Sequence, residues 1–160
     1  MIRMIVTVGG VGLLKPAPGT WGSAVAIPVT YALHVIGGAG LVIAMTFALF
    51  GIGYWASHAY LSGRHEDPSE IVIDEVVGQL IALWPLSIGL WLMDHPSHIF
   101  PWPGVVGGFI LFRLFDIWKP WPIRAFDRPG AVWIMLDDVA AGIAAALVIF
   151  VSAGVSHGWF

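Results

Sequence analysis

Charged residues divide this chain into long apolar stretches, and the lengths of these stretches predict its helices. Between Pro16 and Gly63 there is no Asp, Glu, Lys or Arg. A helix needs about 20 apolar residues to cross a bilayer, so this stretch is long enough for two spans. The turn between them is expected at the glycine-rich residues 37–40.

The rest of the chain follows the same pattern. Between Val76 and Phe112 the only charged residue is Asp94, which predicts two more spans joined by a polar turn, the second of them short. Residues 139–160 carry no charge and form a fifth predicted span. We therefore expect an all-α, polytopic integral membrane bundle of about five spans, with residues 1–160 forming a single domain.

Composition agrees with a membrane protein. Hydrophobic residues make up 58% of the chain and charged residues 11%, whereas soluble domains average about 45–50% and about 25%. The nine tryptophans fit the aromatic belts found at membrane surfaces. There is no cysteine, which excludes disulfides and thiolate chemistry. The short N-terminal apolar run predicts no cleaved signal peptide.

The number of crossings places the charged segments on one face. Two spans separate the N-terminal segment from the acidic stretch near residue 70, and two more separate that stretch from the basic segment that begins at Arg113. An even number of crossings returns the chain to the same side. Most of the basic residues lie in these segments, so the positive-inside rule predicts that this face is cytoplasmic. They are Arg3, Lys15, Arg113, Lys119, Arg124 and Arg128.

The acidic stretch reads HEDPSEIVIDEVVGQ and holds half of the ten acids in the chain. Ser69 is the expected N-cap of a helix in which Glu70 and Asp74 share a face. Carboxylates without a basic neighbour suit a hard cation such as Mg²⁺. We assign Glu66 to a solvated helix start, whereas Asp67, Glu70, Asp74 and Glu75 are candidates for metal binding or catalysis.

The basic segment reads RLFDIWKPWPIRAFDR. Arg113, Asp116 and Lys119 are three residues apart, so they line one helical face until Pro120 interrupts it. Arginine forks match phosphate oxygens, so Arg113, Lys119, Arg124 and Arg128 are candidate phosphate ligands. An equally open alternative is that these residues form ion pairs that anchor the helix at the surface.

Two smaller motifs add to this picture. Asp137 and Asp138 precede the fifth span, where they could compensate the helix dipole or share a divalent cation with the first acidic cluster. In KPAPGTWGS, backbone amides with Thr20 and Ser23 could hold a phosphate at a helix start. A plain capped turn is the alternative there.

Four motifs in order, APGTWGS, DPSEIVIDEVVGQ, FRLFDIWKPWPIRAFDR and IMLDDVAAG, resemble those of the bacterial phosphatidylglycerophosphatase A family. The resemblance covers about residues 9–145. One departure lies before the last motif, where Ala131, Val132 and Trp133 stand at positions at which the family has glycines.

The resemblance implies a multi-pass, all-helical enzyme of the bacterial inner membrane that uses Mg²⁺ to remove the terminal phosphate of phosphatidylglycerophosphate. Its active site would face the cytoplasm, and its partners would be this phospholipid and the bilayer, with no nucleic acid. On this basis Mg²⁺ would be held by Asp74, Glu75 and one or both of Asp137 and Asp138. Asp67, Glu70 or Asp116 would serve as general base. The four basic candidates, with Thr20 and Ser23, would bind the phosphate.

The main alternative is a small membrane transporter that binds a cation with the same carboxylates. Against it, the acids gather at span ends, and none lies at the middle of a span, where a transport pathway would run.

Overall fold

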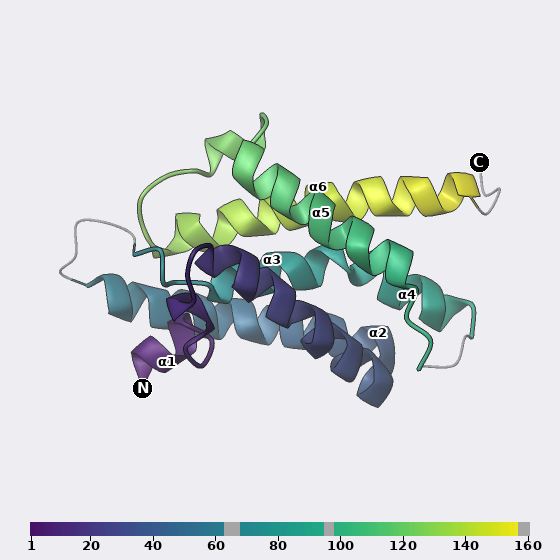
Figure 1. Cartoon of the computed structure of the whole chain (residues 1–160), viewed down its shortest axis with the longest axis horizontal. Helices are drawn as coiled ribbons and strands as arrows, with labels where there is room; N and C mark the ends of the chain where they lie inside the picture. Colours follow the sequence, from purple (N-terminus) through teal and green to yellow (C-terminus); the bar gives the residue numbers. More distant parts are fainter. Residues whose placement is uncertain (63–67, 95–97, 157–160) are drawn as a thin grey trace.

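The computed structural model describes residues 1–62, 68–94 and 98–156, and the regular elements among them are all helical (Figure 1). The membrane bundle predicted from the sequence is therefore confirmed in class. The elements are α1 (Ile2–Val6), the 3-10 turn η1 (Val11–Leu13), α2 (Pro18–Leu61), α3 (Ile73–Ala82), α4 (Trp84–Leu92), α5 (Trp102–Trp118), the 3-10 turn η2 (Ile123–Ala125) and α6 (Ala131–Ser156).

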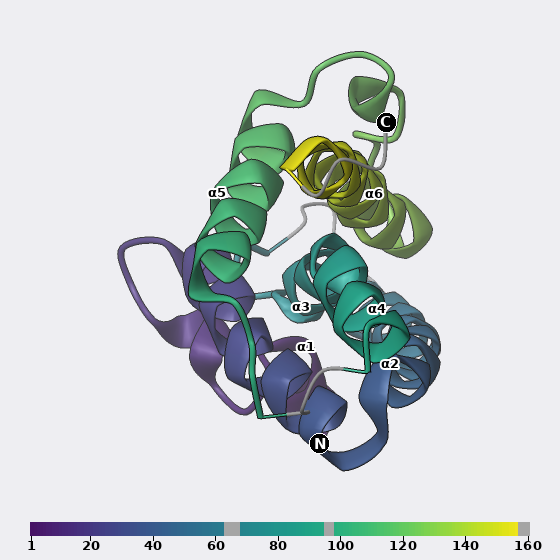
Figure 2. The ribbon, with the colours of Figure 1, turned by 90° about the vertical axis from the view of Figure 1, so that its right-hand side faces the viewer.

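Helix α2 reverses direction at the predicted glycine turn. Gly37 and Gly38 leave helical geometry, and Gly38 has φ of 63°, a left-handed value that glycine adopts without steric cost. The two arms on either side of this turn run back along each other (Figures 1 and 2). With α3–α4, α5 and α6, they account for the five predicted spans.

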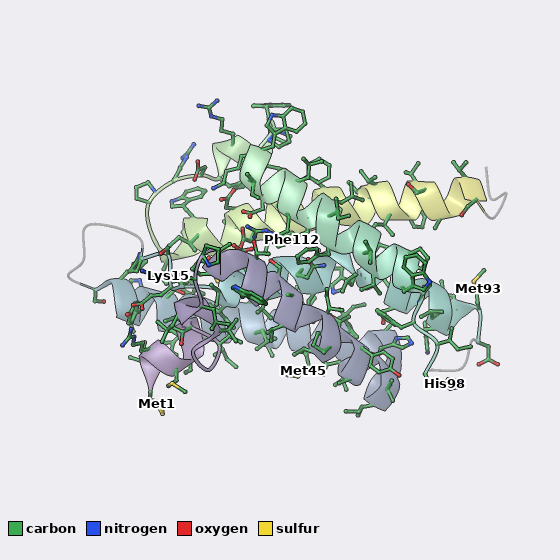
Figure 3. The ribbon with its side chains drawn as sticks, viewed as in Figure 1. Met1, Lys15, Met45, Met93, His98 and Phe112 are labelled. Carbon is green, nitrogen blue, oxygen red and sulfur yellow. The ribbon has the colours of Figure 1, made fainter. Side chains whose placement is uncertain are left out.

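Three helical segments of the described chain are long and apolar enough to cross a membrane: Pro18–Leu61, Ile73–Leu92 and Ala131–Ser156. Helix α5, with 17 residues, is the short span expected from the sequence. Lys15 lies at one end of the bundle, and Met93 and His98 lie at the other (Figure 3). Exposed tryptophans mark both ends, with Trp118 and Trp121 beside the charged segments and Trp91 and Trp102 near the opposite end.

Helix α3 lies at the centre of the bundle, surrounded by α2, α5 and α6 (Figure 2). Every residue of α3 except Glu75 is buried. Glycines allow a close approach to α6, because a Cβ on Gly142 would lie 2.4 Å from the Gly78 carbonyl oxygen. A Cβ on Gly78 would likewise lie 2.6 Å from the Asp138 carbonyl oxygen. This contact brings the acidic start of α3 against the acidic part of α6.

The expected start of α3 was wrong. The helix begins at Ile73 and not after Ser69. Residues 68–72 form a turn in which the Ile71 amide donates to the Pro68 carbonyl and the Val72 amide donates to the Val6 carbonyl. Docking on α1 thus satisfies backbone groups that a longer helix would have used. Glu70 is outside the helix and does not share a face with Asp74.

The expected start of the last span was also wrong, because α6 begins at Ala131. Asp137 and Asp138 lie about two turns inside the helix and are not at its mouth. Both are buried, so they do not act as solvated dipole-compensating groups. The helix can include these acids because it packs on protein at this point.

Candidate active site

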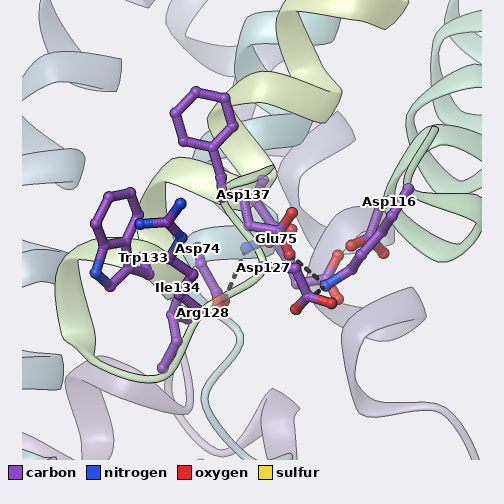
Figure 4. Close-up of a pocket in the computed structure, with 11 residues that line it drawn as sticks. Asp74, Glu75, Asp116, Asp127, Arg128, Trp133, Ile134 and Asp137 are labelled. Carbon is purple, nitrogen blue, oxygen red and sulfur yellow. Dashed lines mark hydrogen bonds and ion pairs between the residues drawn. The ribbon is translucent and has the colours of Figure 1, made fainter. Parts of the chain in front are cut away.

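A cavity of about 240 Å³ opens at the charged end of the bundle, between α3, α5, α6 and the segment that precedes α6 (Figure 4). Two basic side chains, Lys119 and Arg128, and three apolar side chains, Phe126, Trp133 and Ile134, contribute to its wall. The wall also contains six carboxylates: Asp74, Glu75, Asp116, Asp127, Asp137 and Asp138. Segments far apart in the sequence thus place an excess of negative charge around one space.

Three of these carboxylates, from three different helices, come closest together. One oxygen each of Glu75 on α3, Asp116 on α5 and Asp138 on α6 lies within 4.8 Å of the other two. We call these residues the carboxylate triad. Oxygen donors of this kind suit a hard divalent cation. Asp116, which the sequence suggested as a general base, therefore joins the candidate metal ligands.

Arg113 supports the triad from within the bundle. Its guanidinium forms ion pairs with Glu75 and with Asp116, the latter at 2.8 Å, and its side chain is 15% exposed. Ser23 Oγ on α2 lies 3.1 Å from Glu75 Oε2 and 3.4 Å from Arg113 Nη1. Arg113 and Ser23, both predicted to bind phosphate, are instead found in contact with a triad carboxylate, and neither lines the cavity.

Lys119 ends α5 in an unusual backbone conformation. Its φ of 46° is left-handed, which is uncommon for a residue with a side chain. From this position its ammonium pairs with Asp127 at 2.9 Å and with Asp137. Burial lowers the pKa of Lys119, but hydrogen bonds and charge from Asp137 and Asp127 outweigh it and raise the pKa above its usual value. Lys119 is thus a cation at neutral pH.

Comparison with known proteins assigns the chain to a family. The model of the family described as phosphatidylglycerophosphatase A matches residues 4–153. The chain belongs to the phosphatidylglycerophosphatase A family. It is therefore a membrane-bound lipid phosphatase, as the four sequence motifs predicted.

Curated relatives align with this chain over most of their length. Phosphatidylglycerophosphatase A of Escherichia coli is 36% identical over 94% of this chain and 80% of the relative. The protein of the same name from Haemophilus influenzae is also 36% identical, over 93% of this chain and 86% of the relative. A Bacteroides thetaiotaomicron protein provisionally named phosphatidylinositol-3-phosphatase is 35% identical over 93% of this chain and 91% of the relative. No solved structure matches the chain.

Other predicted site residues of this phosphatidylglycerophosphatase A family member lie away from the cavity. Glu70 binds Arg3 at 2.9 Å and accepts a hydrogen bond from Tyr60, so it joins the turn at residues 68–72 to α1 and α2. Thr20 is half-buried in the first turn of α2, and Arg124 is exposed on η2, and neither contributes to the cavity wall. Asp67 lies outside the described residues.

Sequence reasoning did not identify Gly19, although the APGTWGS motif contains it. A Cβ at this position would lie 1.8 Å from Glu75 Oε1 and 3.3 Å from Arg113 Nη1. Only a residue without a side chain lets α2 approach the ion pair so closely. The sequence signal was the presence of glycine inside the first turn of a helix, where it is otherwise unfavourable.

Replacing Gly19 with alanine is therefore expected to displace the Glu75 carboxylate from the triad. The fold should survive, since alanine favours the helix and the clash is with the end of a side chain. If a divalent cation binds at the triad, the concentration of that cation needed for half-maximal phosphate release should rise about 10-fold or more, as for other changes next to metal ligands. Gly40→Ala, in the other arm of α2 with nothing near its Cβ position, is the control. Equal dependence of both variants on the divalent cation would contradict this role for Gly19.

Proposed function

We propose that this protein is a Mg²⁺-dependent phosphatase of the bacterial inner membrane that converts phosphatidylglycerophosphate to phosphatidylglycerol. The relatives from Escherichia coli and Haemophilus influenzae carry the name of this activity and align with nearly the whole chain. The cation, the substrate and the cytoplasmic orientation are all parts of this proposal.

The excess of carboxylates around the cavity is the observation that carries the proposal. Six carboxylates and two basic side chains line a space of about 240 Å³. A phosphate monoester is an anion and would be repelled by this wall unless a cation lay between them. The triad of Glu75, Asp116 and Asp138 offers hard oxygen donors from three helices, so its chemistry fits Mg²⁺. When bound, Mg²⁺ supplies charge neutralisation and polarisation of the phosphoryl group.

The protein's own side chains then have distinct tasks. Lys119 presents a permanent positive charge to the cavity, fixed by its two carboxylate partners, where negative charge grows in the transition state. Arg113 holds Glu75 and Asp116 in place through its ion pairs. The exposed apolar surfaces of α2, α5 and α6 keep the enzyme in the bilayer, beside the acyl chains of its substrate.

The orientation follows from the distribution of basic residues. Six of the seven Lys and Arg residues, all of those in the described parts of the chain, lie in the segments at the active-site end, which the positive-inside rule makes cytoplasmic. Because the chain has no cysteine, single cysteines at positions 94 and 124 can be labelled in spheroplasts. Labelling of position 94 and protection of position 124 are expected, and the reverse pattern would invert the orientation.

The direct test is phosphate release by the purified protein in detergent, with Mg²⁺ and with EDTA. Phosphatidylglycerophosphate should be hydrolysed only with Mg²⁺. Phosphatidylinositol 3-phosphate is the comparison substrate, because the name of the Bacteroides thetaiotaomicron relative refers to it. Faster release from that lipid would reassign the substrate. Mg²⁺ binding without release from either lipid would instead favour the cation transporter.

A further inference from the structure

The segment between α5 and α6 holds an arginine against an aromatic ring at the edge of the cavity. The guanidinium carbon of Arg128 lies 4.9 Å from the centre of a Trp133 ring, a distance at which the ring face attracts a cation. Phe126 packs near the same tryptophan, with ring centres 6.5 Å apart. Figure 4 shows Arg128 and Trp133 together on one side of the cavity and Asp116 on the other.

Arg128 differs from Lys119, the other basic side chain of the cavity, because its charge is not paired with a carboxylate of the described residues and can bind an anionic ligand. Lys119 is committed to Asp127 and Asp137, and Arg113 to Glu75 and Asp116. Arg128 is exposed and forms no ion pair with any carboxylate in the described parts of the chain. An aromatic ring fixes its position without neutralising it, which leaves a planar fork of donors for an anion.

The substrate of the proposed function carries two anionic groups. Its terminal phosphate is a monoester, and a glycerol unit separates it from the phosphodiester that joins the headgroup to the lipid. If the terminal phosphate lies at the triad, the phosphodiester must lie between the triad and the lipid. Arg128 lies at the cavity edge away from Asp116, in the segment that also carries Trp121, which is 85% exposed and marks the membrane surface.

We propose that Arg128, positioned by Trp133, binds the phosphodiester of the lipid and thereby selects substrates with a second phosphate between the reacting phosphate and the acyl chains. This inference rests on the proposed function and adds its headgroup specificity. Arg128 then has a different task from that expected of the basic segment as a whole, since it does not contact the phosphate that is removed. Trp133 is a positioning residue that acts through Arg128.

The test uses two inhibitors that each carry one half of the headgroup. Phosphatidylglycerol contains the phosphodiester without the terminal phosphate, and inorganic phosphate resembles the terminal group alone. In Arg128→Gln we expect the KM for phosphatidylglycerophosphate and the inhibition constant of phosphatidylglycerol to rise about 10- to 100-fold, the range for one charge-assisted hydrogen bond. The inhibition constant of inorganic phosphate and kcat should stay within about twofold of wild type.

Arg124→Gln is the matched control, because Arg124 lies in the same segment, is exposed, and does not line the cavity. It should leave all four constants unchanged. Trp133→Leu should raise the KM for phosphatidylglycerophosphate, as Arg128→Gln does. Trp133→Phe keeps an aromatic ring beside Arg128, so its KM should lie between those of Trp133→Leu and wild type. These measurements use mixed micelles of a neutral detergent, so that the surface charge is the same for every variant.

Two results would overturn the inference in different ways. If Arg128→Gln leaves the KM and the inhibition by phosphatidylglycerol unchanged in an active enzyme, Arg128 does not bind the phosphodiester, although the proposed function stands. If Arg128→Gln weakens inhibition by inorganic phosphate as much as inhibition by phosphatidylglycerol, the arginine contacts the terminal phosphate. A wild-type protein that releases no phosphate with Mg²⁺ would remove the proposed function, and the inference with it.

Discussion

Asp138→Asn is expected to abolish Mg²⁺-dependent phosphate release while leaving the fold intact. Asp138 is the α6 member of the carboxylate triad and is 5% exposed. Asparagine keeps the shape of the side chain but removes one of the charges that would bind the cation. Changes beside metal ligands cost about 10- to 100-fold in affinity or activity, so the loss of a ligand should cost at least about 100-fold.

The stability of this variant should change in the opposite direction. Without a cation, the buried carboxylates of Asp138 and Asp74 and the half-buried carboxylate of Glu75 repel one another, and neutralising one of them relieves this repulsion. In EDTA we expect the melting temperature of Asp138→Asn to equal or exceed that of wild type. Mg²⁺ should raise the melting temperature of wild type, because a ligand stabilises the state that binds it, and should have little effect on the variant.

Asp94→Asn is the matched control, since it makes the same chemical change at an exposed residue next to Met93, which lies at the opposite end of the bundle (Figure 3). Asparagine also tolerates the left-handed backbone found at Asp94, where φ is 50°. Its activity and Mg²⁺ response should match wild type. If Asp138→Asn released phosphate at the wild-type rate and at the same Mg²⁺ concentration, the cation would have to bind elsewhere.

The second large effect is expected for Lys119→Gly, which should keep the fold but lose most of the catalytic activity. Glycine accepts the left-handed conformation that ends α5, so the turn into the following segment is kept. The ammonium between Asp127 and Asp137 is lost, and with it the fixed positive charge in the cavity. Removing one such group from an active site lowers kcat about 10²- to 10³-fold, which single-substrate kinetics in detergent would measure.

Lys119→Ala separates the two contributions of this residue. It removes the same charge but keeps a side chain at φ of 46°, so it should be less stable than Lys119→Gly by about 1 kcal/mol in denaturant unfolding. Its kcat should fall as far as that of the glycine variant. A wild-type kcat in Lys119→Gly would show that the ammonium has no part in the chemistry.

The span pattern could be predicted from the sequence because bilayer thickness limits the length of every apolar stretch. The number of spans and the gathering of charged segments at one end follow from that limit, and the glycines at positions 37 and 38 mark the turn between the first two spans. Helix starts could not be found in the same way. Absence of charge marks where a helix meets lipid, whereas α6 begins at Ala131, in a region that packs on other helices and tolerates buried acids.

The sequence predicted which kinds of residue form the site, but not which of its carboxylates lie next to one another. Acid-rich segments on one face indicated a shared cavity, and the cavity does contain acids from each of them. Which carboxylates lie closest depends on the relative rotation of three helices, and no spacing along the chain shows that Asp116 meets Glu75 and Asp138. Gly19 was equally hidden, since its importance lies in a contact with a residue on another helix.

The central place of α3 has a consequence for how the protein is made. The Ile73–Leu92 segment has a mean hydropathy of 1.5, against 2.2 and 2.3 for the other two long spans, and it carries the fully buried amide of Gln79. Such a segment enters a bilayer poorly by itself, so its insertion depends on α2 before it and α6 after it in translation. Because α6 also supplies Asp138, one helix both covers α3 and completes the carboxylate triad, so a nascent chain that has not yet reached α6 would lack a triad carboxylate.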